Sequence, residues 1–325
     1  TIESVVATDV DTYRQIVVRG PLFADCTGDA TLGVLAGAEW SMGREARSKY
    51  GEPSAPDTAD GMTMGASVQW YCLEADAPTA FPDIEWGLPI DERSVQIVRR
   101  GQWYWEVGMR DDQIADAEKI RDYGMYVAYS TFSYCKNRYS KKEDWTCTHL
   151  VWVSHVSGKR ESRRVVGDYI LREQDLTRPI RHEDETCTTT WRIDQHYPME
   201  KNSQQYPGAE WLSEGVLTPI DFYALPYRCF YSKDVRNMFM AGRNISVTHI
   251  ALGSTRVMRT CGMIGEVVGM AASVCMKRNA LPRDIYTTYF ADLQELMRKG
   301  TGRTDVPYTQ FYHQVDRTGH QAEDR

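Results

Sequence analysis

Alternating apolar and polar positions open the chain and predict short strands followed by a helix. Residues 2–9 and 14–20 have the pattern of a β-hairpin, and residues 21–26 have that of a third strand. Residues 27–38 then turn through Thr, Gly and Asp into a short apolar helix, for which Asp29 is a suitable N-cap. The chain therefore begins with strands that lead into a strand-turn-helix corner.

A second corner of the same kind lies near the carboxyl end. Residues 237–241 form an apolar strand that ends at Gly242-Arg243-Asn244, and residues 259–276 form a helix rich in small residues. Each of its glycines, Gly262, Gly265 and Gly269, costs about 1 kcal/mol relative to alanine. We expect these glycines to let another element or a ligand approach the helix closely.

The middle of the chain, residues 39–235, shows no internal repeat and mixes helical and strand patterns. Helical spacing predicts a helix within 113–130, and apolar runs predict strands at 148–156, 164–171 and 186–194. After it, Pro282 opens one last helix over 282–300, and the polar segment 301–325 is expected to be a tail.

Composition adds that the chain can bury a substantial core. Of its 325 residues, 42% are hydrophobic and the formal charge is −7, which is typical of a globular protein of about two domains. No run approaches the roughly 20 apolar residues of a membrane span. The acidic balance argues against general binding of nucleic acid.

The eight cysteines contain no C-x-x-C spacing. We expect buried free thiols, with a disulfide between distant cysteines left open, and no zinc or iron–sulfur site. The pair His149 and His155 lacks a third ligand, so we expect no metal site.

Several polar residues are candidates for chemistry. Asp194 and His196 share one face of an extended segment, where a carboxylate can orient an imidazole for proton transfer, and His249 is a second proton-transfer candidate. Structural hydrogen bonding is the alternative for both. The arginines Arg160, Arg163 and Arg256 either bind an anionic substrate or pair with nearby carboxylates. The aromatic runs Trp70-Tyr71 and Trp103-Tyr104-Trp105 either pack in a core or stack on sugar rings.

The blocks ADCTGDATLGVLAGA, VSGKRESRRVVGDYILREQDL, TWRIDQHYP, LPYRCFY and NMFMAGRNISVTHIALGSTRVMRTCGMIGEVVGMAASV carry a resemblance over residues 2–278. The chain resembles the FAD-dependent oxidoreductase family often described as heterodisulfide-reductase-subunit-A-like. The resemblance implies an α/β fold: an incomplete Rossmann-type FAD-binding domain made of residues 1–38 and 236–300. It also implies that residues 39–235 are an inserted mixed α+β substrate or cap domain.

The resemblance further implies roles for the two corners. Thr27, Gly28 and Asp29 correspond to a corner where backbone lies against the dinucleotide. At the second corner, Gly242, Arg243 and Asn244 would contact FAD, Arg243 through a phosphate or a neighbouring carboxylate. The helix start at Thr260, Cys261 and Gly262 would face the flavin pyrimidine edge.

Proteins of this kind open with a strand and a G-x-G-x-x-G turn, and that motif is absent from these residues. We therefore expect Thr1 to lie inside the FAD domain, after the fingerprint, and expect FAD binding by the chain as given to be impaired. The resemblance implies hydride transfer at flavin N5, a small-molecule substrate that is anionic or sugar-like, and an electron-transfer partner. The expected compartment is the cytoplasm, or the periplasm, because any targeting signal would precede Thr1.

A second hypothesis is a carbohydrate-active lyase or sugar-binding protein without redox chemistry. A lyase needs a cation to neutralise a uronate and a His or Tyr base, and Arg160, Arg163, His196 and Tyr197 are of these types.

Overall fold

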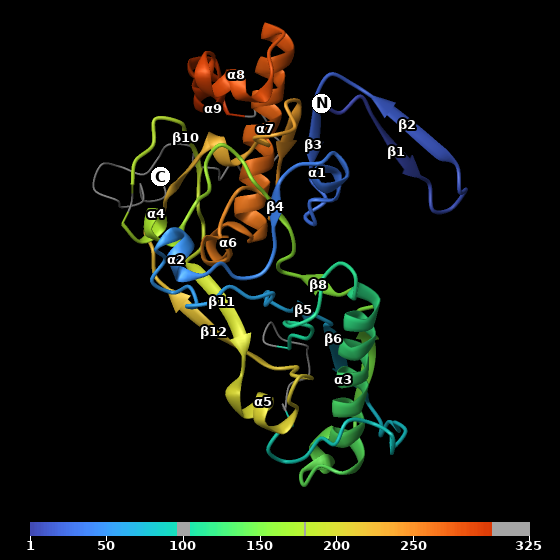
Figure 1. Ribbon diagram of the computed structural model, residues 1–325. Coiled ribbons are helices and arrows are strands. Elements are labelled where there is room, and N and C mark those ends of the chain that lie inside the picture. Colours follow the sequence, from blue (N-terminus) through green and yellow to red (C-terminus); the bar gives the residue numbers. More distant parts are fainter. Residues whose placement is uncertain (96–104, 179, 301–325) are drawn as a thin grey trace. The chain divides into compact units, whose positions relative to one another are not determined.

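The computed structural model describes residues 1–95, 105–178 and 180–300 and divides the chain into two compact units (Figure 1). Unit 1 contains residues 1–60, 162–194 and 217–325, and unit 2 contains residues 61–161 and 195–216. The division places 39–60, 162–194 and 217–235 with unit 1, so unit 2 is narrower than the inserted domain expected at 39–235. The expected polar tail, 301–325, lies outside the described residues.

Unit 1 combines short strands with most of the helices. Its strands are β1 (Ser4–Thr8), β2 (Gln15–Arg19), β3 (Phe23–Asp25), β4 (Trp40–Ser41), β9 (Arg164–Val165), β10 (Glu185–Thr188), β13 (Ala224–Pro226) and β14 (Met238–Met240). Its helices are α1 (Thr31–Leu35), α2 (Arg47–Tyr50), α4 (Glu173–Thr177), α6 (His249–Thr255), α7 (Met258–Arg278), α8 (Pro282–Thr287) and α9 (Phe290–Lys299), with a 3-10 turn η2 (Tyr227–Cys229).

The predicted hairpin at the start of the chain is confirmed. Strands β1 and β2 pair antiparallel with Ser4 opposite Arg19 and Thr8 opposite Gln15, as the blue ribbon of Figure 1 shows. Strand β3 instead pairs in parallel with β14, so that Phe23 lies opposite Met238. This parallel pair brings the two strand-turn-helix corners side by side, because parallel strands end at the same edge.

Helix α7 forms the centre of unit 1 and begins one residue before the predicted segment. Its buried face consists of Met263, Ile264, Val267, Val268, Ala271, Val274 and Cys275, and it lies next to β10, α8 and α9. Its last residues carry Lys277 and Arg278, and Asn279 closes it in the left-handed conformation, a common helix end.

Three predicted elements of unit 1 differ from the structure. The strand expected at 186–194 is interrupted, because β10 (Glu185–Thr188) ends at Thr188 and β11 (Ile193–Pro198) begins at Ile193. The helix expected over 282–300 is two helices, α8 and α9, which meet at Thr288 and Tyr289. Tyr286 of α8 donates a hydrogen bond to Glu183 (2.7 Å), and Phe290 of α9 packs against the ring of Tyr227. The strand expected at 164–171 is only two residues long. An added Cβ on Gly167 would lie 2.5 Å from the carbonyl oxygen of Arg228, so the backbone leaves the strand pairing to pass closely there.

Unit 2 is built on one long helix and two antiparallel strand pairs. Its elements are β5 (Ala66–Ser67), β6 (Trp70–Glu74), α3 (Ala117–Asn137), η1 (Lys142–Trp145), β7 (Thr148–Val153), β8 (Gly158–Lys159) and α5 (Glu200–Gln205). Strand β6 pairs with β7, and β5 pairs with β8. Two more strands, β11 (Ile193–Pro198) and β12 (Ser213–Thr218), pair with each other and contain the unit boundaries.

The core of unit 2 is rich in tryptophan. The rings of Trp70 and Trp105 lie 5.1 Å apart, and Trp105 and Trp211 lie 5.2 Å apart. Helix α3 joins this core through Gly124, where an added Cβ would lie 2.5 Å from Val68. The packing interpretation of Trp70 and Trp105 is therefore confirmed, whereas Trp103 and Tyr104 lie outside the described residues.

Within the described ranges, no single helix is long and apolar enough to cross a membrane. One bent pair, α6 with α7, meets the length and composition criteria, and the two helices meet at 89°.

Candidate functional site

The first corner is organised by the buried carboxylate of Asp25, at the end of β3. Its Oδ1 accepts hydrogen bonds from the backbone N–H (3.0 Å) and the hydroxyl (2.7 Å) of Thr27, and its Oδ2 accepts from the N–H of Gly33 in α1 (2.8 Å). The Thr27 hydroxyl in turn accepts from the N–H of Thr31 (3.0 Å). Asp25 and Thr27 thus bind the N–H groups at the start of α1.

Asp29 is not the N-cap of α1, although the sequence predicted that role for it. The N-cap residue is Ala30, in the left-handed conformation, and Asp29 accepts hydrogen bonds from other parts of unit 1. Its Oδ1 accepts from the Ser162 hydroxyl (2.7 Å) and from Arg243 Nη2 (2.9 Å), while Arg163 Nε donates to its backbone carbonyl (2.9 Å). The capping prediction is wrong because these long-range donors orient Asp29 away from α1.

Arg243 connects the two corners. Its guanidinium lies against Gly28, whose φ of 72° is in the left-handed region and whose added Cβ would lie 2.8 Å from Arg243 Cζ. Next to it, Asn244 is fully buried and donates through Nδ2 to the carbonyl of Asp25 (3.1 Å). The sequence-predicted residues of the two corners, Thr27–Asp29 and 242–244, are therefore neighbours in the fold.

One buried acceptor at this corner has no donor within the described ranges. Asn244 Oδ1 is buried and accepts no hydrogen bond from residues that the structure describes, and it lies 3.5 Å from the position of an added Cβ on Gly242. Gly242 has a φ of 120°, a conformation that L side chains rarely adopt. A buried acceptor beside a residue without a side chain can accept from a hydroxyl of a bound molecule.

The amino end of α7 is the second part of this site. Val257, which precedes the helix, has no polar side chain to cap the first-turn N–H groups. Thr260 is fully buried and its hydroxyl lies 2.8 Å from that of Thr190, so its side chain holds α7 in place. The helix end therefore presents backbone N–H groups and the positive end of the helix dipole.

Arg243 and Arg256 both lie close enough to Cys261 to lower the pKa of its thiol electrostatically. Burial is the larger effect and raises that pKa to about 11, so Cys261 is a neutral thiol. Its Sγ donates weakly to the carbonyls of Thr255 (3.5 Å) and Arg256 (3.4 Å). Cys261 thus links the first turn of α7 to the backbone that precedes the helix.

The predicted glycine face of α7 is open. A Cβ was placed on Gly262, Gly265 and Gly269 in turn. Apart from adjacent residues and the backbone of α7 itself, no atom of the described residues lies within 4 Å of any of these three positions. The prediction that another element of this chain packs there is not met by the described residues. The alternative, that a ligand approaches the helix, stays a prediction.

These features fit FAD. The dinucleotide carries phosphates, which suit Arg243 and the helix end, and ribityl and ribose hydroxyls, which suit the unpaired Asn244 Oδ1. Gly242 leaves the space beside Asn244 Oδ1 free of a side chain. This fit is between the chemical groups of FAD and the residue types present at the corner.

The proton-transfer candidates lie at different places. His196 Nδ1 contacts Glu106 Oε1 in unit 2, and Ser213 donates to the same oxygen (2.8 Å). Asp194, the expected partner of His196, lies 3.7 Å from Arg256 Nη2 and accepts from the indole N–H of Trp191 (3.3 Å). The observed carboxylate beside His196 is therefore Glu106, which sequence reasoning missed.

Glu106 was hard to find because it follows the aromatic run at 103–105 and lies far from His196 in the sequence. It is fully buried, and Arg160 Nη2 approaches its Oε1 to 3.4 Å. Its other oxygen, Oε2, accepts no hydrogen bond from the described part of the chain. A charged residue directly after a tryptophan-rich run was the available signal, since carboxylates are rarely buried without partners.

His249 belongs to a third, separate network in unit 1. It is the first residue of α6 and its backbone N–H donates to Glu45 Oε2 (2.9 Å), while Glu45 Oε1 pairs with the buried Arg164 (2.9 Å). Beside it, Glu52 accepts from the Thr248 hydroxyl (2.5 Å) and from the N–H of Glu173 (2.7 Å). Burial raises the pKa of Glu52.

The three predicted substrate arginines are also dispersed. Arg160 is buried in unit 2 beside Glu106, and its Nη1 donates to Ser67 (2.9 Å). Arg163 lies at the first corner of unit 1 and places its guanidinium 5.7 Å from the ring centre of Trp40. Arg256 lies between α6 and α7 with Asp194. Arg160 belongs to unit 2, whereas Arg163 and Arg256 belong to unit 1, and each has an oxygen partner in its own unit.

The cysteine prediction is confirmed in its main point. All eight cysteines are free thiols and five are buried, namely Cys72, Cys135, Cys187, Cys229 and Cys275. Burial raises the pKa of Cys135, Cys187 and Cys275 to about 12. In the described ranges, no three His, Cys, Asp or Glu side chains are grouped as metal ligands.

Comparison with known proteins gives one match. Residues 1–297 match the family described as FAD dependent oxidoreductase. No curated protein matches the chain. No solved structure matches it either. The family implies a Rossmann-like α/β fold and FAD as cofactor. Because the match covers most of the chain, this protein belongs to the family of FAD-dependent oxidoreductase enzymes.

Proposed function

We propose that this enzyme is of the heterodisulfide-reductase-subunit-A-like kind and transfers hydride between flavin N5 and a small molecule that is anionic or sugar-like. An electron-transfer partner would regenerate the flavin. The observation that carries the proposal is the corner in which Arg243 lies over Gly28 beside the unpaired acceptor Asn244 Oδ1. The family match over residues 1–297 supports the redox chemistry.

In this proposal, residues of unit 1 bind the cofactor. Thr27, Gly28 and Asp29 form one side of the binding corner and Gly242, Arg243 and Asn244 the other. The first turn of α7, with Thr260, Cys261 and Gly262, adds N–H donors and the helix dipole. Bound FAD supplies the hydride-accepting and hydride-donating chemistry. The inserted substrate domain at 39–235 stays part of the proposal.

We assign proton transfer to His196. Glu106 Oε1 lies against its Nδ1, and a carboxylate in this position orients the imidazole for proton transfer. Ser213 donates to the same carboxylate oxygen and thereby fixes its position. Glu106 thus takes the orienting role that Asp194 was expected to have, and His249 remains the second candidate.

Arg163 and Arg256 are the arginines we assign to substrate binding. Both have side chains that are not fully buried, and Arg256 Nη2 donates to the backbone carbonyl of Asp194 (3.2 Å) and lies 3.7 Å from its carboxylate. Arg160 contacts Glu106 in the buried cluster of unit 2, so we assign it to holding that carboxylate.

No specific observation favours the carbohydrate-active alternative. Its two cations, Arg160 and Arg163, contact Glu106 in unit 2 and Asp29 in unit 1. Its aromatic platform includes Trp70 and Trp105, which are buried in the core of unit 2. The family match adds nothing to this alternative.

The test is cofactor binding by the full-length protein. Arg243→Met removes the guanidinium at the corner and is expected to weaken FAD binding at least tenfold, since a hydrogen bond to a charged group contributes about 1.5–3 kcal/mol. The control is Arg298→Met, whose side chain is 72% exposed in α9. Flavin fluorescence quenching measures the affinity. A colourless protein that takes up no added FAD would overturn the proposal.

The role of His196 has a separate test. His196→Asn is expected to lower the rate of substrate turnover while FAD affinity stays unchanged. If His196→Asn turns over at the native rate and His249→Asn does not, the assignment passes to His249.

A further inference from the structure

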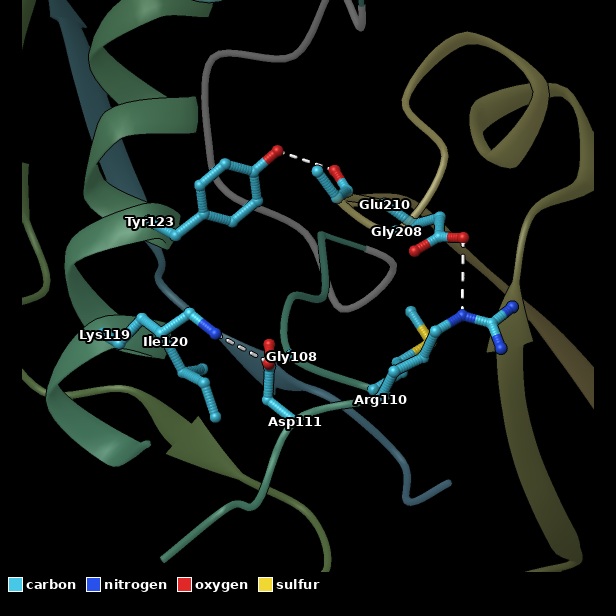
Figure 2. Close-up of a pocket in the computed structure, with 10 residues that line it drawn as sticks. Gly108, Arg110, Asp111, Lys119, Ile120, Tyr123, Gly208 and Glu210 are labelled. Carbon is cyan, nitrogen blue, oxygen red and sulfur yellow. Dashed lines mark hydrogen bonds and ion pairs between the residues drawn. The ribbon is translucent and has the colours of Figure 1, made fainter. Parts of the chain in front are cut away.

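A small pocket in unit 2 is lined by residues outside the cofactor corner and outside the Glu106–His196 cluster. Its volume is about 190 Å³, and Figure 2 shows its walls. Lys119, Ile120 and Tyr123 project from α3 on one side, and Glu210 projects from the facing segment. Arg110 and Asp111 lie between them. Such a volume suits a molecule smaller than the drug-sized ligands that occupy about 300–1,000 Å³.

The backbone at Gly108, on one side of the pocket, packs closely against α3. Gly108 has a φ of 72°, and an added Cβ would lie 2.6 Å from Ile120 Cγ1, so the turn presses directly onto α3. The carbonyl of Gly108 accepts from Gln113 Nε2 (2.6 Å) and from the N–H of Asp111 (3.2 Å). The turn therefore holds Arg110 and Asp111 in fixed positions at the pocket.

Two ion pairs of the pocket offer both signs of charge. Lys119 Nζ lies 2.9 Å from Asp111 Oδ1, and Arg110 Nε lies 3.5 Å from Glu210 Oε1. Two cations and two anions give the lining no net charge. A ligand with a single charge therefore gains less here than one that carries both signs.

Glu210 shows where a ligand would bind. Its side chain is only 8% exposed, and its carboxylate forms an ion pair with Arg110. The Arg110 contact at 3.5 Å is longer than the 2.7–2.9 Å typical of a charged hydrogen bond. A nearly buried carboxylate in this state can accept a further donor, and an ammonium group satisfies it best.

Tyr123 and Ile120 form the remaining wall of the pocket. Burial raises the pKa of Tyr123, so its hydroxyl stays protonated, and it donates to the carbonyl of Ala209 (2.6 Å). The hydroxyl is thus engaged, and the ring of Tyr123 together with the largely buried Ile120 forms the apolar part of the lining. The wall therefore suits a short aliphatic chain between the two charged ends.

We propose that this pocket binds a small zwitterion of the α-amino-acid class. The ammonium group contacts Glu210, the carboxylate contacts Lys119, and the aliphatic side chain lies on Ile120. The inference does not depend on flavin binding. All the residues that it uses belong to unit 2, whereas the proposed cofactor corner belongs to unit 1.

The experiment is calorimetric titration of the full-length protein with L-norvaline, compared with butylamine and pentanoate, which each lack one charged group. Norvaline is expected to bind, and each analogue to bind at least tenfold more weakly, because one charge-assisted contact is lost. No heat with norvaline up to about 10 mM would overturn the proposal. Equal or tighter binding of ribitol, a neutral polyol, would overturn it as well.

Two variants locate the two ends of the ligand. Glu210→Gln is expected to weaken norvaline binding at least tenfold and to leave pentanoate binding unchanged, whereas Lys119→Met is expected to weaken norvaline and to leave butylamine unchanged. The control is Glu118→Gln, on the neighbouring position of α3, whose side chain is 81% exposed and pairs with Arg121. Near-ultraviolet circular dichroism checks folding. Native norvaline affinity in both folded variants would contradict the proposal.

Discussion

The guanidinium of Arg243 lies against Gly28, so closely that a Cβ added to that glycine would be 2.8 Å from Arg243 Cζ. Gly28 also has a φ of 72°. Both facts make glycine necessary where the two corners of unit 1 meet. The contact places a cation beside the loop that follows β3.

This contact predicts a specific effect of Gly28→Ala. The new methyl group displaces Arg243 and breaks its 2.9 Å bond to Asp29, so we expect FAD affinity to fall at least tenfold. The matched control is Gly37→Ala, because Gly37 has a similar φ of 79° but no atom within 4 Å of an added Cβ. Both variants pay about 1–2 kcal/mol for the left-handed backbone. Equal FAD affinity in the two would contradict the role of Arg243.

A second prediction concerns Asp25, which accepts three hydrogen bonds in a fully buried position. In Asp25→Ala the N–H groups of Thr27 and Gly33 lose their acceptor, so we expect a loss of about 3 kcal/mol or more in the free energy of unfolding. Urea denaturation measures it. Asp57→Ala, at a side chain that is 87% exposed, is the control and is expected to change stability by less than about 0.5 kcal/mol.

A third prediction follows from the raised pKa of Glu52. Burial raises it above the model-compound value of 4.5, so between 4.5 and the higher native pKa the folded state binds more protons than the unfolded state. Stability from this group therefore falls as pH rises through that window. Glu52→Gln keeps an acceptor for Thr248 without a charge, and its stability relative to the native protein is expected to increase with pH above 4.5.

Urea denaturation of both proteins at several pH values between 4 and 8 measures that difference. A stability difference for Glu52→Gln that stays flat across the pH range would show that the buried carboxylate does not titrate as inferred.

A fourth prediction uses the exposed thiol of Cys26, which lies between Asp25 and Thr27 at the first corner. Partial burial, followed by the charge of Asp25, raises its pKa, so alkylation by iodoacetamide requires alkaline buffer. We expect FAD to slow this alkylation and to leave that of Cys147, a partly buried thiol in unit 2, unchanged. Mass spectrometry of the labelled peptides measures both. Equal rates for Cys26 with and without FAD would place the cofactor elsewhere.

The sequence by itself determined the local elements and indicated the residues of the two corners at which we propose that FAD binds. Hydrophobic alternation predicted β1 and β2, and helical spacing predicted α3 and α7, because these patterns depend on neighbours one to four residues apart. The two corners were found because glycine and small polar residues at the end of an apolar strand are a local signal as well.

Only the tertiary structure decided which distant side chains meet. Glu106 and His196 are separated by many residues, and nothing local distinguishes the carboxylate that contacts the imidazole from Asp194, which lies two positions away in the chain. The same holds for Asp29, whose partners Ser162 and Arg243 draw it from the helix cap. The zwitterion pocket depends on Gly108 packing against Ile120, a contact between segments. Local patterns fix elements, whereas long-range packing selects the partners of each polar group.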